Sequence, residues 1–79
     1  VLSDEEIEVF NQLSDRRKAE FLAGRFAVKE ALYKAGCRLG FKEVTCLNDE
    51  TGKPYLNIEN TMVSISHEKD YCTAMVVIE

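Results

Sequence analysis

The sequence has no apolar run approaching the roughly 20 residues that a membrane-spanning helix requires. It also has no signal peptide, internal repeat, low-complexity tract or linker rich in proline and glycine. With 79 residues, the chain is too short for two domains, so we expect one domain spanning residues 1–79 and no contact with a membrane. A domain this small buries only about 60–65% of its unfolded surface, which favours association with other copies.

The chain has only three cysteines, and their spacing argues against two common uses. Cys37, Cys46 and Cys72 are odd in number, and none belongs to a C-x-x-C pair. A zinc site and a disulfide framework are therefore both disfavoured. We expect three reduced, structural thiols in a cytoplasmic protein.

Basic residues are few overall, but they are concentrated in one segment. The net charge is −4 and the isoelectric point is near 5.0, which argues against a nucleic-acid partner. Seven of the ten lysine and arginine residues nevertheless fall between positions 15 and 38. A basic segment in an acidic protein predicts an anionic partner for that segment.

The first ten residues, VLSDEEIEVF, carry the signals of a helix start. Ser3 is a capping residue, and Glu6 three positions later completes a capping box. The acidic side chains at positions 4–6 fall in the first turn, where the helix dipole favours negative charge. Leu2 is placed to pack against Ile7 as a hydrophobic staple.

A second helix is predicted from Ser14-Asp15 to about Ala35, with Gly36 in the position that often ends a helix. Gly24 lies inside this helix, where glycine costs about 1 kcal/mol relative to alanine. A glycine at such a position indicates close packing against another element.

The chain after Gly40 has the pattern of strands and turns. The segment FKEVTCL (41–47) is rich in strand-forming residues, and NDETGKP (48–54) is a turn cluster before a short strand at 55–58. Residues 62–78 read as a hairpin, with a turn at 68–70 and with Val63, Ile65 and His67 on one face. Helices followed by an antiparallel sheet define an α+β fold, with the N-terminal helices packed on the sheet.

The long helix also carries charged residues on a surface that is otherwise apolar. Arg25 and Lys29 form one polar stripe, while Glu30 and Lys34 lie about 40° apart on another. The simpler interpretation is a solvated Glu30–Lys34 pair worth roughly 0.2–0.5 kcal/mol. Alternatively, the small residues at positions 23 and 27 leave room for a ligand, and a carboxylate beside a lysine suits a magnesium-bound phosphate.

Three segments together resemble a known family. LAGRFAVKEALYKA, then GKPYL, then VSISHEKDYCTAMVVIE are similar to the holo-acyl-carrier-protein synthases, which are small 4′-phosphopantetheinyl transferases, and the similarity runs from about Leu13 to Glu79. The resemblance implies transfer of 4′-phosphopantetheine from coenzyme A to a serine of an apo-acyl carrier protein for fatty acid synthesis. It also implies a cytoplasmic homotrimer with active sites between subunits.

The resemblance further implies roles for individual residues. Glu30 corresponds to the glutamate that binds Mg²⁺ on the coenzyme A pyrophosphate, and Lys34 to a phosphate-binding lysine that is a candidate for protonating the leaving group. The coenzyme A positions that it implies, besides Lys34, are Arg17, Arg25, Gly52, Lys53, Pro54, Ser66 and His67. Tyr33 and Tyr71 are assigned to packing, in the core or at an interface.

The sequence leaves two further roles open, the docking of the carrier protein and the identity of the general base. The cluster Arg16-Arg17-Lys18 would attract an acidic carrier protein, although such a cluster is ordinarily a solvated first turn. For the general base, Glu30 or a metal-bound water is favoured over His67, which would otherwise be a structural strand histidine.

The sequence departs from the family pattern in three places. Family members begin with a strand whose aspartate supplies a second metal carboxylate, and no such strand precedes Val1. The glycine-rich stretch after the long helix is shortened to GCRLG (36–40). The stretch from Ile58 to Met62, before the S-x-S-H segment, is also shorter than in the family. We therefore expect an N-terminal strand and some loop residues to be missing from these 79 residues. The alternative functions are a non-catalytic coenzyme A-binding module of the same fold and, third, a trimer-forming structural domain.

Overall fold

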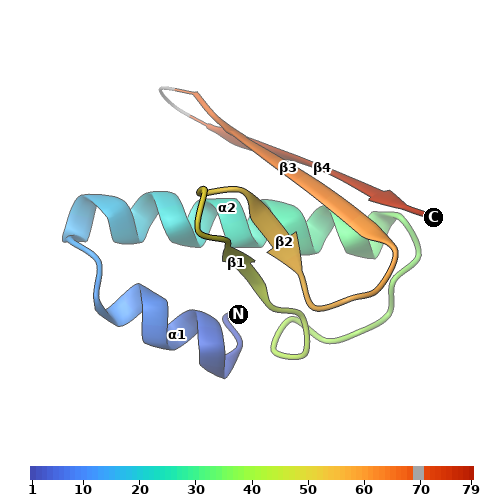
Figure 1. Cartoon of the computed structure of the whole chain (residues 1–79), viewed down its shortest axis with the longest axis horizontal. Helices are drawn as coiled ribbons and strands as arrows, with labels where there is room; N and C mark the ends of the chain where they lie inside the picture. Colours follow the sequence, from blue (N-terminus) through green and yellow to red (C-terminus); the bar gives the residue numbers. More distant parts are fainter. Residues whose placement is uncertain (69–70) are drawn as a thin grey trace.

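The computed structural model describes residues 1–68 and 71–79. Its elements are the helices α1 (Asp4–Asn11) and α2 (Asp15–Lys34) and the strands β1 (Cys46–Asn48), β2 (Pro54–Leu56), β3 (Thr61–His67) and β4 (Cys72–Ile78). The long helix α2 runs through the middle of the molecule, with the β3–β4 hairpin packed on one side and α1 on the other, while the short strand β2 contacts both β1 and β3 (Figure 1). The predicted α+β fold is confirmed.

Both helices begin where the sequence predicts. The Ser3 hydroxyl accepts from the backbone N–H of Glu6 at 3.4 Å, and the Glu6 carboxylate accepts from the backbone N–H of Ser3 at 2.9 Å. Ser14 caps α2 by accepting from the backbone N–H of Arg17 at 3.4 Å. Gly36, with φ of 104°, follows the end of α2 in the left-handed conformation that glycine adopts readily. Local capping chemistry therefore sets the starts of both helices and the end of α2.

The strands form two separate antiparallel pairs, β1 with β2 and β3 with β4. In the second pair Thr61 faces Ile78 and His67 faces Cys72, so the predicted hairpin over 62–78 is confirmed. The predicted turn at 68–70 falls mostly outside the described residues. None of the helices in the described part of the chain is long and apolar enough to cross a membrane.

The predicted strand over 41–47 is wrong for most of its length, because β1 begins only at Cys46. Residues 41–43 form a turn in which the backbone N–H of Glu43 donates to the carbonyl of Gly40 at 2.9 Å. The Glu43 side chain closes the turn by accepting from the N–H of Gly40 at 3.0 Å. Strand-forming side chains are present, but the backbone of this segment is already engaged by local hydrogen bonds.

A small apolar core lies between α2 and the strands, formed by Val28, Leu32, Val44, Cys46 and Val63. On β3, Val63 is buried and Met62 is exposed, as the alternating pattern predicts. Tyr33 and Tyr71 are 57% and 64% exposed, so they do not pack in the core of the chain, and their packing at an interface stays a prediction. The predicted reduced cysteines agree with the structure, in which all three thiols are free.

Gly24 packs closely against β3, as predicted. A Cβ atom at this position would lie 3.6 Å from the His67 ring and 3.6 Å from the Ile65 side chain, which is ordinary van der Waals contact. We therefore expect Gly24→Ala to raise the free energy of unfolding by about 1 kcal/mol, the difference in helix propensity between the two residues. Chemical denaturation would measure this change. A variant less stable than the parent would mean that β3 cannot accommodate the methyl group.

Candidate functional site

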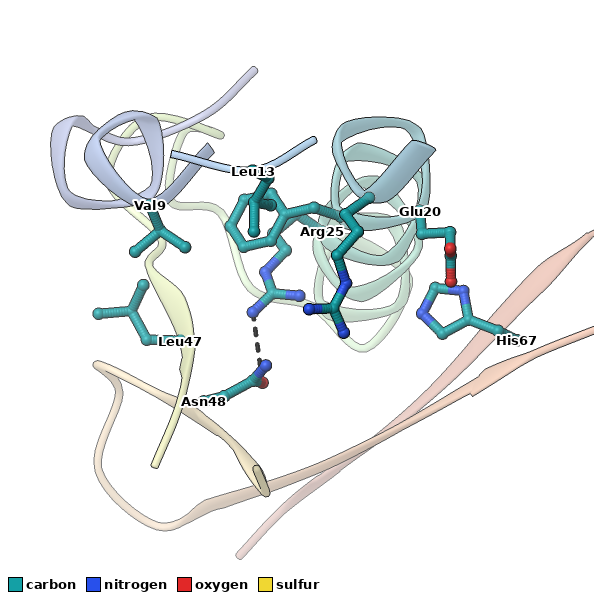
Figure 2. Close-up of a pocket in the computed structure, with 9 residues that line it drawn as sticks. Val9, Leu13, Glu20, Arg25, Leu47, Asn48 and His67 are labelled. Carbon is teal, nitrogen blue, oxygen red and sulfur yellow. Dashed lines mark hydrogen bonds between the residues drawn. The ribbon is translucent and has the colours of Figure 1, made fainter. Parts of the chain in front are cut away.

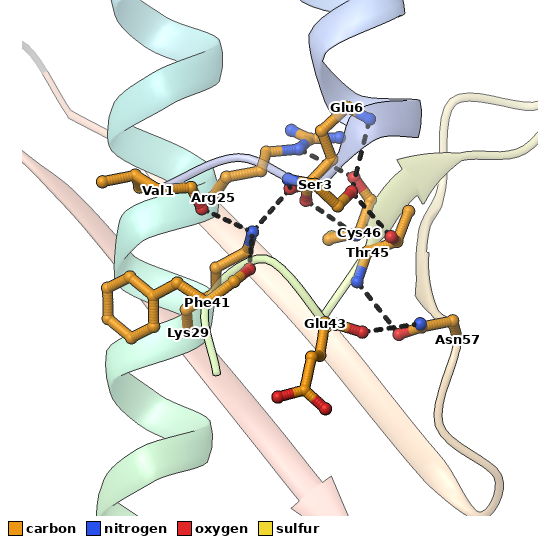
Figure 3. A network of polar contacts seen from close by, with 10 residues as sticks. All are labelled: Val1, Ser3, Glu6, Arg25, Lys29, Phe41, Glu43, Thr45, Cys46 and Asn57. Carbon is orange, nitrogen blue, oxygen red and sulfur yellow. Dashed lines mark hydrogen bonds and ion pairs between the residues drawn. The ribbon is translucent and has the colours of Figure 1, made fainter. Parts of the chain in front are cut away.

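A fully buried ion pair joins the two helices. The ammonium of Lys29 on α2 lies 2.5 Å from the carboxylate of Glu6 on α1, and both side chains are 0% exposed. The same ammonium donates to the carbonyls of Val1 at 2.9 Å and Phe41 at 2.7 Å (Figure 3). The second carboxylate oxygen of Glu6 accepts from the backbone N–H of Cys46 at 2.8 Å. Four separate segments of the chain therefore meet at this pair.

Arg25 is also buried, so the polar stripe predicted for Arg25 and Lys29 points inward. Its Nε donates to the carbonyl of Cys46 at 2.9 Å, and one terminal nitrogen reaches the Asn48 side chain at 3.4 Å. The guanidinium lies 3.9 Å from the centre of the Phe21 ring, within the range of a cation–π contact. Burial lowers the pKa of Arg25, but an arginine at this position remains positively charged at neutral pH.

Arg25 lines a pocket of about 430 Å³, which we call the arginine pocket. Arg17 and Glu20 from α2 and His67 from the end of β3 line it too (Figure 2). The close approach of α2 and β3 at Gly24 brings His67 against this part of the helix. The pocket therefore gathers two guanidinium groups and an imidazole, a set that suits a phosphate group.

Glu30 and Lys34 line a second pocket, of about 240 Å³, together with Phe26, Tyr33 and Phe41. We call it the Glu30 pocket. Glu30 and Lys34 are exposed, and neither forms an ion pair with another described residue. The simpler prediction of a Glu30–Lys34 surface pair is therefore wrong, and both charges are available to a ligand. The rings of Phe26 and Phe41 pack edge to face, with centroids 5.9 Å apart.

The Glu30 pocket offers one carboxylate as a metal ligand. Among residues 1–68 and 71–79, no group of three or more histidine, cysteine, aspartate or glutamate side chains is placed to hold a metal ion. Magnesium commonly binds through one or two carboxylates, substrate phosphates and water. The donor set around Glu30 therefore fits a magnesium ion that is shared with a phosphate-bearing substrate.

The predicted turn at Gly52, Lys53 and Pro54 borders neither the arginine pocket nor the Glu30 pocket. Gly52, with φ of 89°, precedes β2, and Lys53 and Pro54 line a third pocket with residues of β3. The Asp49 carboxylate organises this turn by accepting from Thr51 and from the backbone N–H of Lys53. These hydrogen bonds lower the pKa of Asp49, which keeps the carboxylate ionised.

The other predicted positions are exposed or only partly buried. Ser66 is exposed and borders none of these three pockets, although it neighbours His67. In the first turn of α2, Arg16 lies 3.9 Å from Glu20, and the Lys18 ammonium lies 5.4 Å from the centre of the Phe10 ring. Within one chain, the predicted substrate-binding residues are thus divided among separate pockets.

The Glu6–Lys29 pair is not predicted from the sequence. The capping box fully explains Glu6, and Lys29 is assigned only to a polar stripe on the long helix. A usable signal did exist, because Lys29 lies three residues before Leu32 and one after Val28, both of which belong to the core. A lysine on a core-facing stripe needs a buried partner, since an isolated buried charge is strongly unfavourable.

Comparison with known proteins identifies the relatives of this chain. A family model described as the 4′-phosphopantetheinyl transferase N-terminal domain matches residues 5–77. Proteins named holo-[acyl-carrier-protein] synthase match all of this chain. The one from Geobacillus sp. (strain WCH70) is 46% identical over 89 residues, which is 74% of its length. Those from Anoxybacillus flavithermus and Bacillus subtilis (strain 168) are 47% and 44% identical, over 73% and 74% of their lengths. This chain therefore belongs to the 4′-phosphopantetheinyl transferase family.

Proposed function

We propose that this chain is a holo-acyl-carrier-protein synthase that transfers 4′-phosphopantetheine from coenzyme A to a serine of an apo-acyl carrier protein. The observation that carries the proposal is the Glu30 pocket, in which an exposed carboxylate and a lysine one helical turn away face the same space. The curated relatives carry the name of this activity, and the family match covers nearly the whole chain.

In the proposed reaction, the serine oxygen attacks the phosphorus that carries the pantetheine group. The bond from that phosphorus to the oxygen of the adenosine phosphate breaks, and adenosine 3′,5′-bisphosphate leaves. Lys34 stabilises the negative charge on the leaving phosphate and gives it a proton. Phosphoryl transfer depends mainly on positioning and on such charge stabilisation. Lys34 and a metal-binding Glu30 can supply both.

Glu30 would hold Mg²⁺ together with the diphosphate of coenzyme A. When bound, the ion supplies positive charge that offsets the charge developing on the phosphate oxygens. The proton of the incoming serine would go to Glu30 or to a metal-bound water, which we prefer to His67 because His67 lines the arginine pocket instead. The arginine pocket, with Arg17 and Arg25, binds a further phosphate of coenzyme A.

The remaining proposed contacts are those with the carrier protein and with neighbouring subunits, and they are inferred from charge and exposure. The cluster Arg16-Arg17-Lys18, in which both arginines are exposed and Lys18 is partly buried, would attract an acidic carrier protein. The residues assigned to coenzyme A lie in separate pockets of one chain, and the outer face of the hairpin exposes Met62, Met75 and Val77. Both features support association of several copies, with neighbouring subunits completing each active site, and we assign the protein as a cytoplasmic homotrimer.

Lys34→Ala tests the proposed chemistry. We expect kcat for transfer to apo-carrier to fall by about 10²-fold or more, because general acid catalysis contributes on that scale. The dissociation constant for coenzyme A should change much less. Lys42→Ala, which removes an exposed lysine outside the pockets, is the matched control. If coenzyme A binding weakened while kcat stayed unchanged, Lys34 would be a binding residue only.

Metal removal separates an enzyme from a non-catalytic binding module. With EDTA present, we expect transfer to stop and coenzyme A binding, measured by calorimetry, to weaken, because Glu30 and the diphosphate would repel each other without the ion. Added Mg²⁺ should restore both. Binding that is independent of Mg²⁺, without any transfer, would support the module instead.

A further inference from the structure

The buried Lys29–Glu6 pair is connected to the Glu30 pocket in two ways. The first connection runs through the backbone of Phe41. The Lys29 ammonium donates to the Phe41 carbonyl at 2.7 Å, and the ring of the same residue forms one wall of the Glu30 pocket. That ring packs edge to face on Phe26, another wall of the pocket. Lys29 thus fixes the end of the segment that closes the pocket.

The second connection is the helix itself. Lys29 and Glu30 are consecutive on α2, so their side chains leave the helix about 100° apart. The Lys29 ammonium is held by three oxygens, from Glu6, Val1 and Phe41. Contacts on one side of a helix fix its rotation about its axis. The same contacts therefore fix the direction in which Glu30 projects into its pocket.

From this geometry we propose that Lys29, held in place by Glu6, is a positioning residue for phosphopantetheine transfer. It orients Glu30 and places the Phe41 wall of the pocket, while its own ammonium is fully buried and touches no substrate. This inference rests on the proposed function. The competing explanation is that the ion pair serves stability alone.

A pair of variants distinguishes the two explanations. Lys29→Met leaves the Glu6 carboxylate buried without its partner, so its melting temperature should fall sharply. The double variant Glu6→Gln/Lys29→Met removes both charges, and replacing a buried ion pair by neutral groups commonly restores stability. In the double variant, however, no ammonium holds the Phe41 carbonyl. We expect its melting temperature to recover while kcat stays at least about tenfold below that of the parent, a loss of roughly 1.4 kcal/mol in transition-state stabilisation.

Val76→Ala is the matched control for stability. It removes apolar volume on β4 that packs against the core and lines none of the three pockets described above, so it should lower the melting temperature without lowering kcat at temperatures where it is folded. If kcat of Glu6→Gln/Lys29→Met recovered together with its melting temperature, the positioning role would be overturned.

A second measurement does not depend on activity. NMR contacts between the Phe26 and Phe41 rings should be present in the parent chain and in Val76→Ala, and should be weakened or lost in the double variant. Ring contacts that are unchanged in the double variant would overturn the role of Lys29, whether or not the parent transfers phosphopantetheine. A parent chain without transfer activity would instead overturn the proposed function itself.

Discussion

Replacing Lys29 with methionine is expected to lower the free energy of unfolding by about 3–5 kcal/mol, the usual cost of breaking a buried ion pair from one side. Glu6 is 0% exposed, and without Lys29 its carboxylate would keep only the backbone donors of Ser3 and Cys46. The carbonyls of Val1 and Phe41 would also lose their donor. Chemical denaturation followed by circular dichroism would measure the change.

The effect is large compared with the total stability of a small domain, which is typically about 5–15 kcal/mol. Lys34→Met is the matched control, because it makes the same chemical change on the same helix at an exposed position. It should alter stability by no more than about 0.5 kcal/mol. If the two variants were equally stable, the Lys29–Glu6 pair would have no structural importance in solution.

Replacing Glu30 with glutamine is expected to reduce kcat for transfer by about 10²–10³-fold, the scale on which one preorganised electrostatic group contributes to catalysis. The amide keeps the size of the side chain but lacks the charge that binds a divalent ion. Because Glu30 is exposed and forms no ion pair with another described residue, the variant should fold like the parent. Steady-state rates at saturating coenzyme A, together with melting curves, would measure both quantities.

Glu8→Gln makes the same change at an exposed position on α1 and serves as the control. It should retain the rate of the parent chain. Full activity in Glu30→Gln would contradict the role assigned to the carboxylate and would leave the arginine pocket as the candidate active site.

The parts of the fold that were predictable are those that local chemistry determines. The capping box at Ser3 and Glu6, the glycine after α2 and the alternation along β3 each depend on residues a few positions apart. The segment 41–47 was predicted wrongly because its backbone is engaged by the turn at Gly40 and by the Lys29 ammonium. Strand propensity is weaker than such specific contacts.

The candidate site, like the fold, was predictable only where residues a few positions apart determine it. Helical spacing alone placed Glu30 and Lys34 on one side of α2, where they line one pocket. The partner of Lys29 could not be identified, because Glu6 lies 23 positions away and already had a sufficient local role as a cap. The distribution of Arg25, Lys53 and Lys34 among separate pockets depends on how the strands pack on α2, which no local pattern specifies.

The most direct test of the proposed function is the intact mass of an apo-acyl carrier protein after incubation with this chain, coenzyme A and Mg²⁺. We expect the carrier to gain the mass of one phosphopantetheine group, and the gain to be absent or strongly slowed when Glu30→Gln replaces the parent. A carrier whose mass does not change with the parent chain, or changes equally fast with Glu30→Gln, would contradict the proposed function.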